Sequence, residues 1–460
     1  MTKTKIETVY QTILRQIEQG KITSGTRLPS IRNAAEDFKV SKNTIVTVYD
    51  QLVVNGMVSA KQGAGFFVNS TKLKLAEVKP EHVKQASDII SLLRAQLEKD
   101  YLVRVGDGRP PASWMDDTIP KRSSPNAISA IKNDSSGYGS PYGYGALRDC
   151  IVTQHQALNL DISADQIVTT FGANHALDLI IRRYLSPGDT VLVDDPGYYP
   201  LFAKLKLSKI NFVGVKRTLN GPDLKDLKNK AENLKPLLFF TQSTAQNPTG
   251  SSFDLRTAHS VLQIASQYNF LIVDDDPFID LLSVKGTRLA TLDGFNNVMF
   301  VGTYSKTLSA SYRSGYIIAH PDIVASLAEL KMITSVNSSR YSEIIIAEFI
   351  NSRRYQKHLK KISNRVIEAA NNVSNKLSDM GFELFTRNTF GYYLQLMLPP
   401  NISDLELAQN AAKKGIFLAP GSLFAVDSEK SLPSLRINVT RADDVRFYNF
   451  LKTNLLNYNS

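Results

Sequence analysis

The sequence predicts a multi-domain protein with a winged helix-turn-helix at the N-terminus, a large α/β domain with a mostly parallel sheet, and a small α+β domain. A chain of 460 residues exceeds the size at which one hydrophobic core is usual. The first part carries three helical patterns and a hairpin pattern, and the rest alternates short apolar runs with helical stretches. We therefore expect a winged helix-turn-helix over 1–70, a linker over 71–100, and the larger domains over 101–460, with the small domain from about 341.

Local signals mark each element of the N-terminal domain. Apolar residues recur at helical spacing over 6–17, which predicts the first helix. Pro29 and Ser30 introduce a short second helix, and Ser41 is a typical N-cap for a third. Two extended runs over 58–68 flank a glycine-containing turn, which favours a hairpin.

The segment 71–100 differs from its neighbours on both sides. It begins polar and becomes helical near Ile89 and Leu93. Because glycine and proline are sparse there, we expect a semi-rigid linker with some helix of its own.

The remaining chain is typical of an α/β domain. Helical stretches at 173–185 and 255–268 separate some of the apolar runs, and a long helical region from Tyr341 to about Met380 leads to the last part. Nearly continuous apolar strands between helices favour a mostly parallel sheet covered on both faces. The apolar runs lie at 166–172, 190–193, 210–215, 236–241, 270–274, 298–303 and 315–319.

The net charge of +11 is concentrated at the N-terminus, where residues 1–75 hold eleven Lys and Arg against five Asp and Glu. Such an excess indicates a polyanion partner, although charge alone favours a solvated lysine-rich surface. A single cysteine, Cys150, excludes a disulfide within the chain and fits a reducing compartment. With no signal peptide and no apolar run of membrane-spanning length, we expect a cytoplasmic protein with no membrane partner.

The third predicted helix has the small and polar N-terminal residues that reading a major groove requires. Ser41, Lys42 and Thr44 lie at its start, and Arg32 on the preceding helix is placed to contact backbone phosphates. Gly63 allows the wing tip to approach a minor groove closely. We therefore expect double-stranded DNA as a partner, the alternative being a helical protein-interaction module.

The run Gly25-Thr-Arg-Leu-Pro-Ser-Ile-Arg32, then Val40-Ser-Lys-Asn-Thr44, Tyr49 and Gly63-Ala-Gly-Phe-Phe-Val68, resembles the GntR-type winged helix in order and spacing. The resemblance implies that Arg32, Lys42, Thr44 and Gly63 contact DNA. The family often has arginine where Lys42 and Val46 stand. Because lysine does not make the bidentate contact with guanine, the resemblance does not determine which bases are read.

In the α/β region, polar residues follow several predicted strands, where open α/β sheets bind their ligands. Lys306 follows the strand at 298–302, and Asp275 lies in a run of three acids after another strand. The other candidates are Ala173 and Asn174 at a predicted helix N-terminus, Tyr198 and Asn247 in loops, Thr303, Ser305 and Arg313 around the lysine, and Arg436 in an apolar strand.

These residue types match the needs of pyridoxal 5′-phosphate (PLP). The cofactor requires a lysine amine, an acid for its ring nitrogen, a stacking aromatic ring and donors for its phosphate. Each residue also has a simpler reading: Lys306 solvated, Asn247 in a turn, and Arg436 in a structural salt bridge. A metal site at the acids lacks the further ligands it would need, so we expect no metal.

In order, these motifs resemble fold-type I aminotransferases over about 101–460. The resemblance includes Tyr138-Gly-Ser-Pro-Tyr-Gly-Tyr-Gly-Ala-Leu-Arg148, Asn247-Pro-Thr-Gly250 and Pro420-Gly-Ser422. It implies that Lys306 forms the internal aldimine as the catalytic lysine, that Asp275 pairs with the pyridine nitrogen and that Arg436 takes a substrate or effector carboxylate. It assigns the phenolic oxygen to Asn247, ring stacking to Tyr198, and the phosphate to Ala173, Asn174, Thr303, Ser305 and Arg313. Where the family usually has a tyrosine, this chain has Phe278, which removes a hydrogen bond to the phenolic oxygen.

The two domains together resemble the MocR family of bacterial transcription regulators over nearly the whole chain. That resemblance implies a homodimer that binds an operator and senses PLP, or PLP with an amine or amino acid, through an aldimine at Lys306. Two alternatives remain open: an active aminotransferase carrying a DNA-binding domain, and a repressor whose large domain only dimerises. The sequence does not determine transaminase turnover, the effector, the operator, or whether transcription is activated or repressed.

Overall fold

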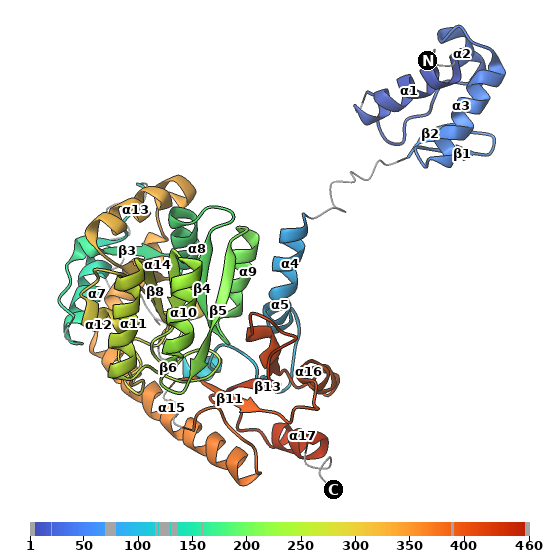
Figure 1. Cartoon of the computed structure of the whole chain (residues 1–460). Helices are drawn as coiled ribbons and strands as arrows, with labels where there is room; N and C mark the ends of the chain where they lie inside the picture. Colours follow the sequence, from blue (N-terminus) through green and yellow to red (C-terminus); the bar gives the residue numbers. More distant parts are fainter. Residues whose placement is uncertain are drawn as a thin grey trace. The chain divides into compact units, whose positions relative to one another are not determined.

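The computed structural model describes residues 5–455 except 20, 70–79, 116–117, 119–128, 130–136, 159 and 388–390. The chain divides into two compact units, Met1–Pro80 and Glu81–Ser460. Each unit is described by itself (Figure 1). Among the described residues, no helix combines the length and the apolar character needed to cross a membrane.

The N-terminal unit has the predicted three helices and hairpin. Ser30 and Ser41 cap the second and third helices, accepting hydrogen bonds from the backbone N–H groups of Asn33 and Thr44. The core of the unit centres on Ile45, Val48, Tyr49 and Leu52, against Val9, Ile13 and Ile17 of the first helix. The elements are α1 (Lys5–Glu18), α2 (Ile31–Asp37), α3 (Lys42–Val54), β1 (Val58–Lys61) and β2 (Gly65–Val68).

A third extended segment, residues 25–28, pairs with this hairpin and was not predicted from the sequence. The backbone N–H of Leu28 donates to Phe66 O at 2.8 Å, and that of Val68 donates to Thr26 O at 3.0 Å. The segment has glycine and proline near its ends, a composition typical of a loop. Its pairing with β2 fixes the wing against the helices.

Part of the segment expected as a linker folds with the second unit. Helices α4 (Glu81–Ile89) and α5 (Ser91–Glu98) belong to Glu81–Ser460, and α4 packs against α9 (Tyr199–Leu207). Leu92 is buried in the same core as the sheet. Apolar burial therefore places this stretch in the larger unit, while 70–79 lies outside the described residues.

The larger unit is built on an eight-stranded, mostly parallel sheet of order β3-β10-β9-β8-β7-β4-β5-β6. Strands β5, β4, β7, β8 and β9 are parallel, whereas β10 is antiparallel to β3 and β9, and β6 is antiparallel to β5. Each predicted strand is present. The strands are β3 (Ile167–Thr170), β4 (Thr190–Asp195), β5 (Asn211–Thr218), β6 (Gly221–Pro222), β7 (Leu238–Thr241), β8 (Leu271–Asp276), β9 (Val298–Thr303) and β10 (Gly315–Ile318).

Helices cover both faces of this sheet (Figure 1). In β4, Leu192 packs in one core, whereas Val191 and Val193 pack in the other, as a pleated strand requires. The first core contains residues of α7 (Gly145–Gln156), α10 (Leu224–Leu234), α11 (Leu255–Tyr268), α12 (Leu289–Asp293) and α14 (Arg340–Asn351). The second contains residues of α8 (Ala173–Tyr184), α9 and α13 (Pro321–Ser335).

The long helical region predicted from Tyr341 to about Met380 is present and consists of two helices. They are α14 and α15 (Arg353–Asp379), and Ser352 lies between them. An antiparallel three-stranded sheet of order β11-β13-β12 then packs with α16 and α17 around a third core. The elements are β11 (Tyr393–Met397), α16 (Asp404–Lys413), β12 (Ala419–Pro420), β13 (Ser434–Asn438), α17 (Val445–Leu455) and the short helices η2 (Ala112–Trp114), η4 (Ala164–Gln166), η5 (Ala310–Tyr312) and η6 (Gly421–Phe424).

Candidate functional site

A cavity of about 550 Å³ lies in the larger unit, and residues at the carboxyl ends of β8 and β9 form part of its wall. All ten residues predicted for the cofactor and the effector line it, although they come from segments up to 263 positions apart. These residues are Ala173, Asn174, Tyr198, Asn247, Asp275, Thr303, Ser305, Lys306, Arg313 and Arg436.

The structure distinguishes the three adjacent acids at the end of β8. Asp274 accepts hydrogen bonds from the backbone and side chain of Ser243, and Asp276 forms an ion pair of 2.7 Å with Arg288. In Asp275, Oδ2 accepts a hydrogen bond from Gln242, while the buried Oδ1 has no partner among the described residues. Asp275 is therefore the acid with an oxygen left for a ligand.

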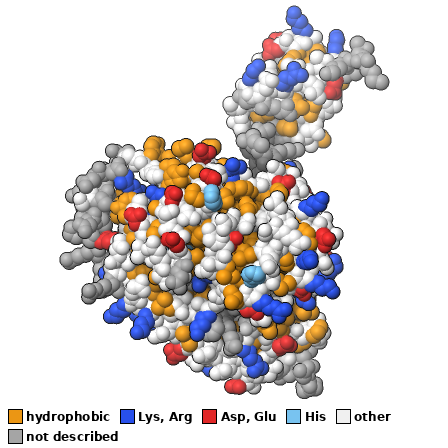
Figure 2. Space-filling view, turned by 60° about the vertical axis from the view of Figure 1, so that its left-hand side comes forward, with side chains coloured by type: hydrophobic (Ala, Val, Ile, Leu, Met, Phe, Trp, Pro, Cys, Tyr) orange, Lys and Arg blue, Asp and Glu red, His pale blue; other side chains and the backbone are white. Residues whose placement is uncertain are grey.

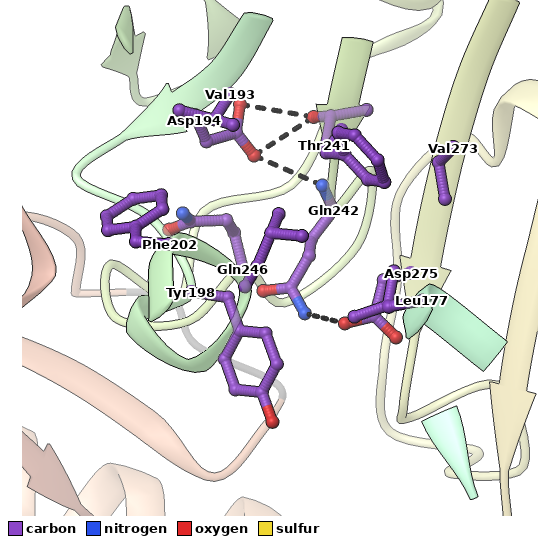
Figure 3. A pocket seen from close by; sticks show the side chains of 12 residues that line it. Leu177, Val193, Asp194, Tyr198, Phe202, Thr241, Gln242, Gln246, Val273 and Asp275 are labelled. Atoms are coloured by element: carbon purple, nitrogen blue, oxygen red, sulfur yellow. Dashed lines mark hydrogen bonds between the residues drawn. The ribbon is translucent and has the colours of Figure 1, made fainter. Parts of the chain in front are cut away.

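Burial is the main cause that raises the pKa of Asp275 to about 7. The hydrogen bond from Gln242 opposes this shift, and the neighbouring Asp274 and Asp276 add to it. A cationic partner such as a protonated pyridine nitrogen would offset the cost of holding this carboxylate charged. Figure 3 shows Gln242 directed at Asp275, with the Tyr198 ring beside them.

Gln242 connects several parts of the site and was not predicted from the sequence. Its Nε2 lies 2.8 Å from Asp275 Oδ2, and its Oε1 accepts the backbone N–H of Asn247 at 2.8 Å. Its own backbone N–H donates to Asp194, which forms a buried ion pair of 3.0 Å with Arg217. The one available signal was a polar residue directly after the apolar strand β7.

Lys306 is held inside the cavity. Its Nζ donates to the backbone oxygen of Gly108 and to the hydroxyl of Tyr393, the latter at 3.2 Å. Tyr393 in turn donates to Gly108 O at 2.9 Å. The structure thus contradicts the reading of Lys306 as an ordinary solvated lysine, and it adds Gly108 and Tyr393 to the site.

One end of the cavity has the donors that a phosphate needs. Ala173 and Asn174 are the first residues of α8, so their backbone N–H groups lie at a helix N-terminus. Arg313 donates to Phe171 O at 2.9 Å, and a Cβ at Gly172 would lie only 3.3 Å from its guanidinium. The hydroxyls of Thr303 and Ser305 complete this set, 3.1 Å apart.

Arg436 is almost fully buried and pairs with neutral groups. It donates to Asn247 Oδ1 at 3.2 Å and to Gly106 O at 2.7 Å, and its guanidinium lies 4.9 Å from the centroid of the Tyr393 ring and 4.8 Å from that of Phe424. Its Nε has no partner, and no carboxylate among the described residues forms an ion pair with it. The structural salt bridge considered for Arg436 is therefore not found, and the guanidinium suits a bound carboxylate.

Phe278 lies outside this set of lining residues. Its ring is fully buried and packs edge-on against Tyr392 and Tyr393, with centroids 5.0 and 5.7 Å away. The position offers packing rather than a hydroxyl. The phenol that reaches the lysine is Tyr393 instead.

In the N-terminal unit, the predicted DNA-contacting residues lie at three places: the start of α3, the turn of the hairpin, and α2. Ser41, Lys42 and Thr44 lie at the start of α3, where Ser41 accepts the Thr44 N–H at 3.1 Å. Gly63 lies in the turn of the hairpin with a φ of 75° and open space around it. Arg32 on α2 is exposed and forms a weak pair of 3.4 Å with Glu36. Figure 2 shows further Lys and Arg side chains over this unit.

Comparison with known proteins covers both units. Residues 101–449 match the family model described as aminotransferase class I and II, and residues 5–68 match bacterial regulatory proteins of the gntR family. YdfD of Bacillus subtilis, described as an uncharacterized HTH-type transcriptional regulator, is 24% identical over 92% of this chain and 90% of its own length. The HTH-type transcriptional regulator NorG of Staphylococcus aureus is 24% identical over 88% of this chain and 94% of its own length.

Solved structures share the fold of the larger unit. Pyrococcus horikoshii kynurenine aminotransferase, solved in complex with PMP, superposes with a TM-score of 0.70 at 24% identity and covers 83% of this chain and 95% of that one. The α-aminoadipate aminotransferase LysN of Thermus thermophilus gives 0.70 at 21% identity, covering 80% and 98%. The fold prediction is confirmed.

Proposed function

Because the chain belongs to the class I and II aminotransferase family and begins with a gntR-type domain, we propose that it is a MocR-type transcription regulator. Its winged helix binds an operator, and its large domain binds PLP and senses an amine or amino acid. The observation that carries this proposal is the cavity in which Asp275, Lys306 and Arg436 meet. The names of the relatives YdfD and NorG support the regulatory role.

The lining residues fit PLP at each of its functional groups. Asp275 offers an unpartnered buried oxygen for the ring nitrogen, and Lys306 offers its amine to the aldehyde. The N-terminus of α8 and Arg313 offer donors to the phosphate. When bound, PLP supplies an aldehyde that condenses reversibly with amines, with loss of water.

This chain's residues make the site responsive to an effector. With PLP bound, an effector amine would compete with Lys306 for the aldehyde, and Gly108 O and the Tyr393 hydroxyl would accept hydrogen bonds from the released Lys306 amine. Arg436 binds the effector carboxylate in place of one of its neutral partners. Because Arg436 lies on β13, this exchange links the cavity to the small-domain sheet.

In the proposed homodimer, these shifts change the spacing of two winged helices and so their fit to two half-sites. The test uses duplex DNA selected from a random pool by the full-length protein with PLP. Its affinity is measured with each amino acid added in turn. The wild type is expected to show at least one amino acid that changes affinity about tenfold, equivalent to roughly 1.4 kcal/mol of coupling.

The matched variants for this test are Lys306→Ala and Lys228→Ala, an exposed lysine on α10. The first is expected to lose the response and the second to keep it. A Lys306→Ala protein that responds as the wild type does would refute the covalent part of the proposal. Steady conversion of amino acid and keto acid by the wild type would point instead to an active aminotransferase.

A further inference from the structure

The first half of α15 carries a dense basic run. Residues 353–367 contain six Lys and Arg and no Asp or Glu. Over 76–460 as a whole there are 43 Lys and Arg against 38 Asp and Glu, so the rest of that region is slightly acidic without this run. Figure 1 shows α15 along the outside of the larger unit, away from the cavity helices α8 and α9.

The basic side chains share one side of the helix. Arg354, Lys357, Lys360 and Lys361 are exposed, and Arg365 is partly exposed. The opposite side is buried and consists of Tyr355, Leu359, Ile362 and Val366. We call the five exposed or partly exposed residues the α15 basic face.

This arrangement is unfavourable for the isolated helix. The first turn of α15 has no acidic residue and contains Arg354, at the end of the helix where its dipole is positive. Pairs such as Lys357 and Lys361, four residues apart, place like charges together on one face. A bound polyanion would offset both effects.

The packing holds part of the face in place. The Arg354 guanidinium lies over the Phe349 ring at 5.2 Å, and that of Arg365 lies over the Trp114 ring at 5.6 Å. Stacked arginines keep their edges available for phosphate oxygens. At the other end of the helix the pattern differs, because Lys376 pairs with Asp443 at 2.5 Å.

We propose that the α15 basic face is a second DNA-binding surface, which contacts phosphates of the duplex outside the bases read by the winged helix. From Arg354 to Arg365 the helix rises about 16 Å, which matches about five base-pair steps of a duplex. A small anion would occupy only a fraction of that length. A second copy of the same face would be repelled by its equal charge. The inference rests on the proposed DNA-binding function.

The test compares two duplexes: the selected operator alone, and the operator extended by about 20 base pairs of unrelated sequence on each side. The variant is Lys357→Glu with Lys360→Glu. The control is Lys225→Glu with Lys228→Glu, two exposed lysines of α10. Affinities are measured for full-length protein with PLP at several salt concentrations, and circular dichroism confirms that each variant is folded.

The wild type is expected to bind the extended duplex more tightly and with a steeper salt dependence, since each neutralised phosphate adds about 0.9 to the slope. The affinity of the α15 variant is expected to fall about tenfold or more for the extended duplex and less than twofold for the short one. Equal losses on both duplexes, the same loss in the α10 control, or no loss would overturn the inference. So would a loss of self-association in sedimentation, which would assign the face to a subunit contact. A wild type that binds neither duplex would instead refute the proposed function.

Discussion

Asp275→Asn is predicted to have opposite effects on the cofactor-free protein and on the PLP complex. In the folded chain burial raises the pKa of Asp275 to about 7, from the ordinary value of 3.8. Between about pH 4 and 7 the unfolded chain has released this proton while the folded chain keeps it, so the free energy of unfolding falls as pH rises. A shift of this size corresponds to a cost of up to about 4 kcal/mol above pH 7.

Asparagine removes that cost because it never ionises. The cofactor-free variant should therefore match the wild type near pH 4 and exceed it in stability at pH 8. PLP binding should weaken about tenfold to a hundredfold, because a charge-assisted hydrogen bond of roughly 1.5–3 kcal/mol is lost. Denaturant midpoints at pH 4–8 and PLP titrations followed by absorbance measure the two effects. A cofactor-free variant less stable than the wild type at pH 8, or unchanged PLP affinity, would refute the reasoning.

Three further substitutions test separate parts of the structure. Gln242→Leu should destabilise the protein by about 2–3 kcal/mol and weaken PLP binding, because buried groups of Asp275 and Asn247 lose their hydrogen-bond partner. Denaturant unfolding measures the loss of stability, and a midpoint within error of the wild type would contradict it. Arg436→Lys should weaken the binding of α-amino acids about tenfold but leave the binding of amines without a carboxylate unchanged, as measured by absorbance titration. Equal weakening for both kinds of ligand would argue against carboxylate binding by Arg436. Ser41→Ala should lower the free energy of unfolding of the N-terminal unit by about 1 kcal/mol, because α3 loses its N-cap. An unchanged melting temperature of that unit would show that the cap does not contribute to stability.

The sequence predicted the positions of the strands and the residues at their ends well, because both depend on local patterns. An apolar run followed by Asp275 or Lys306 identifies a strand end, and parallel strands bring such ends to one edge of a sheet. Helix caps at Ser30 and Ser41 were equally readable, since a cap bonds to a residue three positions away.

The features that were missed depend on contacts between distant segments. Gly108 lies 198 positions from Lys306, and nothing local marks it as an acceptor for the lysine. From its local sequence Tyr393 is recognisable only as a strand residue, and its contact with Lys306 in the cavity depends on the tertiary fold. Similarly, the pairing of the 25–28 segment with β2 and the docking of α4 on α9 are tertiary events that override loop-like or linker-like composition.

The most direct test of the central claim is to treat the PLP-soaked protein with borohydride and map its peptides by mass spectrometry. The account predicts that the reduced cofactor is found on Lys306, and that excess amino acid added before reduction lowers the labelling. A protein that carries no label, or carries it on a different lysine, would contradict the account.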